Sequence, residues 1–317
     1  MPQTTQSEFQ GRKLEDALNQ YRDVLTTLSG KSRLKLEEID LGTYKDGGKT
    51  FPFIYFVLGE NLQYGTGTDY FLSGGIHGDE PGTEILLHLL GTLSLGYLAG
   101  TQQLLTQGRA IIYPVISAGA YENGTRENLD GINVNRTIWV PENRLAELNL
   151  KKPKEISLLE ESIKSQFDPE SNTLFLDFHG DGRYPNTVYA LANSHPDSET
   201  IARKALAHTS QKYNIPLYTG NIPESNESEP EKQVLLENNR GVFSKNPLVY
   251  EGAFGPKPEW RKLANPPVEI TLETNYDDIK EARFAGTAAG LAILAEHWLK
   301  FPSSLVGNYG KLPKYVR

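Results

Sequence analysis

The sequence predicts an α/β fold with a mixed, mostly parallel central sheet and helices on both faces. Short apolar runs alternate with helix-like segments along the 317 residues, which is the pattern of strands joined by helical crossovers. Several apolar runs end abruptly in polar, glycine-rich residues, and ligands bind at the carboxyl ends of strands in such sheets. Hydrophobic residues make up 38% of the chain, which is enough for a large packed core.

The first predicted element is an amphipathic helix over 7–28, where leucines and a tyrosine recur at helical spacing. Two strand-like runs follow at 34–41 and 51–58, separated by a turn containing Asp and Gly. No repeat or linker divides the rest of the chain. We therefore interpret residues 1–30 as a helical extension and residues 31–317 as a single catalytic domain.

The remaining elements alternate in type. Strands are expected at 70–72, 110–116, 174–178, 187–192 and 268–272. Helices are expected at 83–95, 153–165, 198–213 and 279–299. Residues 219–232 have no periodicity and many Ser, Asn, Glu and Pro, so we expect a mobile surface loop there.

Charge and composition exclude several classes of function. The net charge of -8 argues against nucleic-acid binding, which needs a basic surface. There are no cysteines, so a metal ion would be held by His, Asp or Glu. The longest apolar stretch, 85–100, is too short to span a membrane, and no signal peptide is visible at the N-terminus. We expect a cytoplasmic protein with no membrane partner.

The string Ile76-His77-Gly78-Asp79-Glu80 follows a buried strand and precedes Pro81 and a helix. A neutral imidazole and a carboxylate at this spacing can point at one Zn²⁺ ion. A catalytic zinc site needs a third protein ligand, and His179 is the candidate because it ends the strand at 174–178 and is followed by glycine. Without His77 and Glu80, a packed or capping histidine would be the better interpretation of His179.

Three further polar residues are typical of an anion site. Asn135 and Arg136 lie in the string Gly131-Ile132-Asn133-Val134-Asn135-Arg136, and Arg126 precedes Asn135 by nine residues. The planar guanidinium matches a carboxylate, and asparagine adds a donor, so this group can bind an anionic substrate end and a developing oxyanion. Surface salt bridges are the simpler alternative.

The late strand carries the candidate general base. Alternation places Glu269, Thr271 and Glu273 on one face of the strand, and Glu273 lies at its end. A hydrolase needs a base that takes a proton from the attacking water and passes it to the leaving group.

Two other histidines are not assigned to the site. His88 is expected to be packed, and His297 is expected to face solvent or a groove.

Taken in order along residues 50–300, these motifs resemble the zinc carboxypeptidases of the M14 family. The resemblance implies a zinc carboxypeptidase-like fold and one zinc ion per chain. It implies that His77, Glu80 and His179 bind the zinc, that Glu273 is the general base, and that Arg126 stabilises the oxyanion. It further implies that Asn135 and Arg136 hold the terminal carboxylate of the substrate and that Tyr250 closes over it.

The sequence departs from the family pattern in places. Many members carry Asp where this chain has Asn133, and a neutral amide pulls less strongly on a zinc histidine, which would lower metal affinity. Murein-peptidase members tend to have Pro where this chain has Asn275. The short spacing from Arg126 to Asn135 is nevertheless more similar to the spacing in these compact bacterial murein peptidases than to the spacing in the digestive enzymes of the family.

The leading hypothesis is a metallocarboxypeptidase or amidase that cuts an amide bond next to a free carboxylate in a short peptide, such as a cell-wall peptide. The alternative keeps the metal site and changes the substrate to an N-acyl amino acid, as in succinylglutamate desuccinylase and aspartoacylase. A third hypothesis is a carboxylate-binding module without activity, which predicts loss of a ligand or of the base, and neither is missing from the sequence.

Overall fold

The computed structural model describes most of the chain. The described residues are 9–32, 34–60, 62, 67–95, 108–180, 184–193, 196–218, 220, 222–224, 234–236, 238–239, 241–245, 257–263 and 266–300. Within this part of the chain no helix is both long and apolar enough to cross a membrane.

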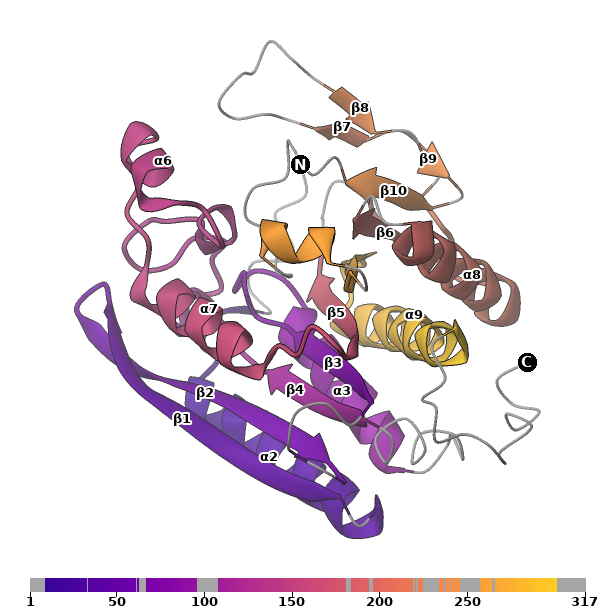
Figure 1. The fold of residues 1–317 in the computed structure, drawn as a ribbon, viewed down its shortest axis with the longest axis horizontal. Coiled ribbons are helices and arrows are strands. Elements are labelled where there is room, and N and C mark those ends of the chain that lie inside the picture. Colours follow the sequence, from indigo (N-terminus) through magenta and orange to yellow (C-terminus); the bar gives the residue numbers. More distant parts are fainter. Residues whose placement is uncertain are drawn as a thin grey trace.

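One large sheet organises the molecule (Figure 1). Its strands are β1 (Lys35–Asp46), β2 (Lys49–Gly59), β3 (Thr68–Ser73), β4 (Gly108–Tyr113), β5 (Asn172–His179), β6 (Thr187–Asn193), β9 (Asn238–Asn239), β10 (Val242–Lys245) and β11 (Val268–Asn275). Their order in space is β1-β2-β4-β3-β5-β11-β6-β10-β9. The central strands β4, β3, β5 and β11 are parallel to one another, whereas β2 joins β4 and β6 joins β11 in antiparallel register. β7 (Ile222–Glu224) and β8 (Val234–Leu236) form a separate antiparallel pair.

Helices cover both faces of this sheet. They are α2 (Leu14–Ser32), α3 (Gly82–Ser94), α5 (Ala118–Asn123), α6 (Glu142–Glu147), α7 (Lys154–Gln166), α8 (Pro196–Tyr213) and α9 (Ile279–Lys300). Two 3-10 turns, η1 (Val134–Arg136) and η2 (Pro258–Lys262), complete the described helical structure. Contacts link α2 to α3, α3 to α9 and α9 to α8, so these four helices form one layer.

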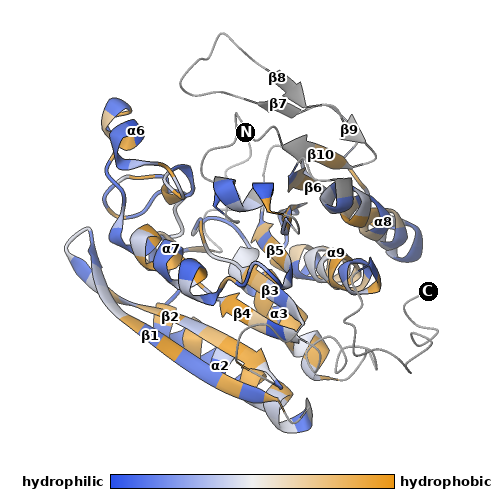
Figure 2. Ribbon diagram, viewed as in Figure 1, coloured by the Kyte–Doolittle hydropathy of each residue, from blue (hydrophilic) through white to orange (hydrophobic). Residues whose placement is uncertain are grey.

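The alternation of side chains along β5 separates the two helical layers. Phe175 contacts the ring of Phe167, the residue that follows α7, with 6.4 Å between ring centroids. Phe178 packs instead against Gly290 of α9. The layer of α9 and the helix α7 therefore lie on opposite faces of the sheet, and both faces are buried. Figure 2 shows the apolar residues concentrated in the central strands, with hydrophilic residues on the outward sides of α7 and α8. The predicted fold class is confirmed.

The first helix begins later than the sequence predicts. We expected it over 7–28, but α2 runs over Leu14–Ser32, because Gly11 adopts the left-handed region at φ 78° and interrupts the helix there. Leu18, Tyr21, Leu25 and Leu28 of α2 belong to the main hydrophobic core. The Tyr21 hydroxyl donates to the Thr83 carbonyl of α3 at 2.7 Å.

The predicted loop at 219–232 is only partly described. Residues 222–224 of it form β7, and residues 219, 221 and 225–232 lie outside the described residues. The sequence did not predict the short strand β10, which extends the main sheet through parallel pairing with β6.

Candidate metal centre

The site is built at the carboxyl ends of three neighbouring central strands. β3 ends at Ser73 and leads into the loop that carries His77 and Glu80, and β5 ends at His179. β11 lies beside β5 in parallel register, with Glu273 opposite His179. The topology of the sheet therefore gathers motifs that are about two hundred residues apart in sequence.

The loop is held by the helix that follows it. Pro81 is the N-cap of α3, and its carbonyl accepts a hydrogen bond from the Ile85 amide at 2.9 Å. Apolar residues recur every three or four positions along α3 and are buried against the core. The helix therefore fixes the position at which Glu80, one residue before its cap, enters the site.

His77, Glu80 and His179 form one buried group. The ligand atoms that they offer all lie within 4.8 Å of one another. His77 Nδ1 is 2.8 Å from Glu80 Oε1, and His179 Nδ1 is 2.8 Å from Glu80 Oε2. The relative exposure of these residues is 1%, 6% and 3%, so their polar atoms are shielded from bulk solvent.

The outer nitrogen of each histidine also contacts an oxygen atom. His77 Nε2 is 3.1 Å from Asn133 Oδ1, and His179 Nε2 is 2.6 Å from Asp177 Oδ2. The second oxygen of Asp177 accepts a hydrogen bond from the Ser73 hydroxyl. A histidine that donates from Nε2 to such an oxygen would offer its Nδ1 to a metal ion, in place of the contact that Nδ1 makes here with Glu80.

The electrostatics of the group favour a bound cation. Burial alone would lower the pKa of His179, but the carboxylates of Asp177 and Glu80 raise it well above its usual value. Burial likewise opposes ionisation of Glu80, yet His77 and His179 hold its pKa well below the usual range. The carboxylate of Glu80, which attracts a proton onto His179, would attract a metal cation at the same place.

These residues fit a zinc ion. Two imidazole nitrogens and one carboxylate oxygen are the donor set of catalytic zinc sites, which retain an open position for water or substrate. The oxygen partners on both outer nitrogens are the supporting contacts that such ligands usually have. The arrangement supports a metal site made of His77, Glu80 and His179.

Arg126 lies at the rim of this group. Its Nη1 donates to Glu80 Oε1 at 2.7 Å, while its side chain remains 50% exposed. Burial tends to lower the pKa of Arg126, but the carboxylates of Glu80, Asp79 and Glu273 raise it above the usual value. The structure therefore brings Arg126 within electrostatic reach of both Glu80 and Glu273, and leaves it accessible from solvent.

Asn135 and Arg136 lie on η1, which is tied to the metal group through Asn133. Asn135 is 8% exposed, and among the described residues its Oδ1 atom accepts no hydrogen bond. Arg136 is half-buried on the same turn. The contact between Asn133 and His77 sets the distance of this turn from the metal group. Tyr250, the remaining predicted residue, lies outside the described residues.

Sequence reasoning missed the role of Asp177. It lies two residues before His179 on β5, so both side chains are on the same face of the strand. That alternation was the available signal: an acidic residue two positions before a strand-end histidine can reach its ring. Ser73 carried no comparable signal, because only the parallel pairing of β3 with β5 places it opposite Asp177.

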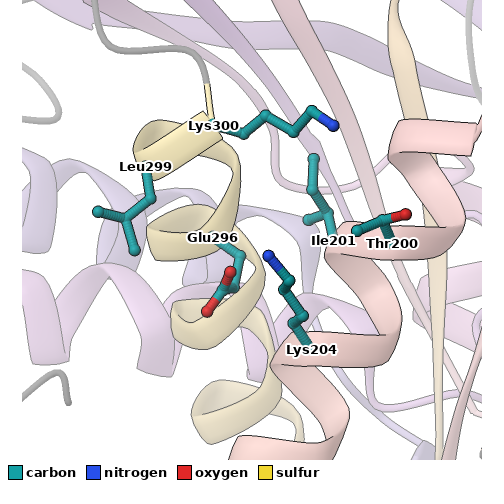
Figure 3. A pocket seen from close by; sticks show the side chains of 6 residues that line it. All are labelled: Thr200, Ile201, Lys204, Glu296, Leu299 and Lys300. Carbon is teal, nitrogen blue, oxygen red and sulfur yellow. The ribbon is translucent and has the colours of Figure 1, made fainter.

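A separate hollow of about 220 Å³ lies between α8 and α9 (Figure 3). It is lined by Thr200, Ile201, Lys204, Glu296, Leu299 and Lys300. Figure 3 shows Lys204 extending toward Glu296 across the two helices. None of the predicted site residues that the structure describes lines this hollow, so it is not the site that the motifs predicted.

The sequence matches no protein-family profile and no curated protein. Its structure is similar to solved structures of metallopeptidases. A protein from Shewanella denitrificans, provisionally assigned as a metallopeptidase, aligns with a TM-score of 0.60 and 17% identity over 89% of each chain. A metallo-carboxypeptidase from Burkholderia cenocepacia aligns with a TM-score of 0.58 and 15% identity, over 87% of this chain and 68% of that one.

A third similar structure holds a small ligand. It is a metallo-carboxypeptidase from Pseudomonas aeruginosa in complex with (2-guanidinoethylmercapto)succinic acid, with a TM-score of 0.56, 14% identity, and coverage of 87% of this chain and 68% of that one. At such low identity the similarity establishes the architecture. The chain therefore has the fold of the metallo-carboxypeptidases, with a buried His-Glu-His group at the carboxyl ends of its central strands.

Proposed function

We propose that this protein is a zinc-dependent hydrolase that cuts an amide bond next to a free carboxylate of a short peptide. The observation that carries the proposal is that the ligand atoms of His77, Glu80 and His179 lie within 4.8 Å of one another. Arg126 donates a hydrogen bond to Glu80 at the same place. The similarity of the fold to metallo-carboxypeptidases supports the same class of reaction.

Each residue has a part in this reaction. Zinc, when held by His77, Glu80 and His179, lowers the pKa of water and polarises a carbonyl. Glu273 takes a proton from the attacking water and delivers it to the leaving amine. Arg126 donates hydrogen bonds to the carbonyl oxygen as its negative charge develops.

The substrate is oriented by its own charge. Asn135 and Arg136 bind the terminal carboxylate, because a guanidinium and an amide together offer several donors in a fixed geometry. The nearly buried Oδ1 of Asn135, which accepts no hydrogen bond from any described residue, accepts an N–H group of the substrate. A peptide with a blocked C-terminus should therefore bind poorly.

The same metal group also suits removal of an acyl group from an amino acid. That reaction needs the same base and oxyanion donor, and its substrate also presents a carboxylate to Arg136. The order of the Arg126, Asn135 and Arg136 motifs favours the peptide, so the deacylase is the second candidate.

The first experiment is mass spectrometry of products formed by zinc-loaded protein from a mixed panel. The panel holds free peptides, the same peptides with amidated C-termini, diaminopimelate-containing wall peptides, and N-acyl amino acids. Release of C-terminal residues from the free peptides alone supports the proposal. Release of only acetate or succinate would instead identify the deacylase, and equal cleavage of free and amidated peptides would contradict the role of Arg136.

The general base can be tested separately. Glu273→Gln keeps the size of the side chain but removes its basicity, so turnover should fall by about a thousandfold or more. Zinc content, measured by atomic emission, should stay at one ion per chain, because Glu273 is not a proposed ligand. The exposed Glu281→Gln on α9 is the matched control. Turnover retained in Glu273→Gln would show that another group is the base.

A further inference from the structure

Asn128 lies at the centre of the turn that connects the two anion-binding motifs. Its Oδ1 atom accepts hydrogen bonds from the Ile132 amide at 2.9 Å and the Asp130 amide at 3.2 Å. Its backbone amide donates to the Ile132 carbonyl, and its carbonyl accepts from the Gly131 amide. One side chain thus closes the whole turn, and it is only 5% exposed.

The amide nitrogen of Asn128 fastens this turn to a helix. Its Nδ2 donates to Glu155 Oε1 at 2.9 Å, and Glu155 is 1% exposed in the first turn of α7. α7 is itself bound to the sheet, since the Ser162 hydroxyl donates to the Tyr113 hydroxyl of β4 at 3.0 Å. The contact between Asn128 and Glu155 therefore connects a surface turn to the fixed framework of the fold.

The neighbours of the turn are the residues that would touch the substrate. Arg126 precedes Asn128 by two residues, and Asn135 and Arg136 follow it. The segment from Thr125 to Arg136 is held at its start by the loop that carries His77 and Glu80, because the Gly78 amide donates to the Thr125 carbonyl at 2.7 Å. The following end is tied by the contact of Asn133 with His77. Between these ends, Asn128 holds the chain through Glu155, and the Asp130 amide also donates to Asp46 Oδ1 at 3.1 Å.

We propose that Asn128 is a positioning residue. Through Glu155 it fixes the distance between Arg126, at the scissile carbonyl, and Arg136, at the terminal carboxylate, and so determines the length of substrate that the two arginines can hold together. This inference rests on the proposed function of both arginines. It predicts that loss of the contact between Asn128 and Glu155 weakens binding of the carboxylate without removing the metal.

The contact can be broken and restored by two substitutions. Asn128→Asp keeps the acceptor for the two backbone amides. At pH 8, above the raised pKa of Glu155, it also places a carboxylate against the Glu155 carboxylate, so KM for a free peptide should rise about tenfold, which corresponds to 1.4 kcal/mol. The double variant Asn128→Asp, Glu155→Gln reverses the donor and acceptor at unchanged net charge, and KM should return to within about threefold of the parent value. Asn149→Asp, at an exposed position, is the control for the chemical change alone.

A double-mutant cycle separates positioning from a general loss of structure. If Asn128 acts through the carboxylate site, then Asn128→Asp should change KM little in a protein that already carries Arg136→Ala. Equal losses in both backgrounds would overturn the inference, as would a double variant that fails to recover KM while the protein remains folded and zinc-loaded.

Hydrogen exchange provides a readout that does not depend on turnover. In Asn128→Asp the amides of residues 130–136 should exchange faster, while those of α3 should keep their protection. Unchanged exchange at 130–136 would overturn the inference even in an active protein. A parent protein that cleaves no carboxylate substrate would instead reject the proposed function, and with it the role of this turn in substrate binding.

Discussion

Asp177 and Asn133 have corresponding positions behind the two histidines, but only Asp177 carries a charge. Asp177 is 2.6 Å from His179 Nε2, and Asn133 is 3.1 Å from His77 Nε2. A carboxylate behind an imidazole makes its other nitrogen a stronger ligand than an amide does. His77 is therefore expected to be the weaker of the two ligands.

This asymmetry predicts the effect of Asn133→Asp. A carboxylate behind His77 should tighten zinc binding by about tenfold or more, because it raises the basicity of Nδ1. Competition with a chromophoric chelator would measure the dissociation constant, with Asn149→Asp as the control for added charge. An unchanged or weaker affinity would show that Asn133 does not act through His77.

The residues also show where sequence reasoning is reliable. His77 and Glu80 could be selected because they are three residues apart in the loop after an apolar strand, and His179 because it ends another, where the topology brings strand ends together. Two other histidines were interpreted wrongly. His88 is exposed and contacts Thr287, whereas His297 is fully buried, and burial lowers its pKa to about 3. Helical periodicity alone could not decide which faces of α3 and α9 the neighbouring helices would cover.

At the scale of elements, the start of α3 is packed closely against the end of β5. A Cβ atom on Gly82 would lie 2.1 Å from the Phe178 carbonyl oxygen, one residue before His179. This approach keeps the loop of His77 and Glu80 close to the strand that carries the third ligand. No side chain larger than hydrogen fits there without moving one of the two elements.

Gly82→Ala should therefore move the loop that carries His77 and Glu80 away from His179. We expect the free energy of unfolding to fall by about 1–3 kcal/mol, and zinc affinity to fall with it. Gly91→Ala in the same helix is the matched control, because a Cβ there would meet nothing within 4 Å and should stabilise the helix by about 1 kcal/mol. Denaturant unfolding and zinc titration of both variants measure these changes, and equal behaviour would contradict the packing argument.

Elements with strong patterns were predictable, and weak ones were not. The strand expected at 174–178 is β5, and the helix expected at 279–299 is α9, because both patterns are long and apolar. The short elements α5, η1 and β10 have no periodicity of their own and depend on the rest of the fold. The contact between Asn128 and Glu155 likewise depends on the tertiary structure, because the two residues are 27 positions apart, so the spacing of motifs could not reveal it.

For the whole molecule, stability should depend on pH through Glu155. Burial, opposed by the hydrogen bond from Asn128, raises its pKa from 4.5 to about 7. Between these two pH values the folded protein holds a proton that the unfolded chain has lost, so the free energy of unfolding declines as pH rises from about 4.5 to about 7. The decline is at most about 3 kcal/mol, at 1.36 kcal/mol for each pH unit.

Glu155→Gln should remove this decline, because glutamine does not titrate. The variant should match the parent near pH 4 and be more stable by about 1–3 kcal/mol at pH 8. Denaturant unfolding across this range measures the difference. Glu161→Gln, an exposed position on the same helix, is the control. A difference in stability between the parent and Glu155→Gln that does not change with pH would show that Glu155 ionises normally.

The packing of α2 also has a consequence for synthesis on the ribosome. The hydroxyl of Tyr21 bonds to a carbonyl 62 residues later, and Leu18, Leu25 and Leu28 are buried in the same core. The apolar side of this helix is translated long before α3, and at about 5–20 residues per second it stays uncovered for several seconds. A nascent chain in this state is a natural target for chaperones, and it would aggregate readily if translation stalled between the two helices.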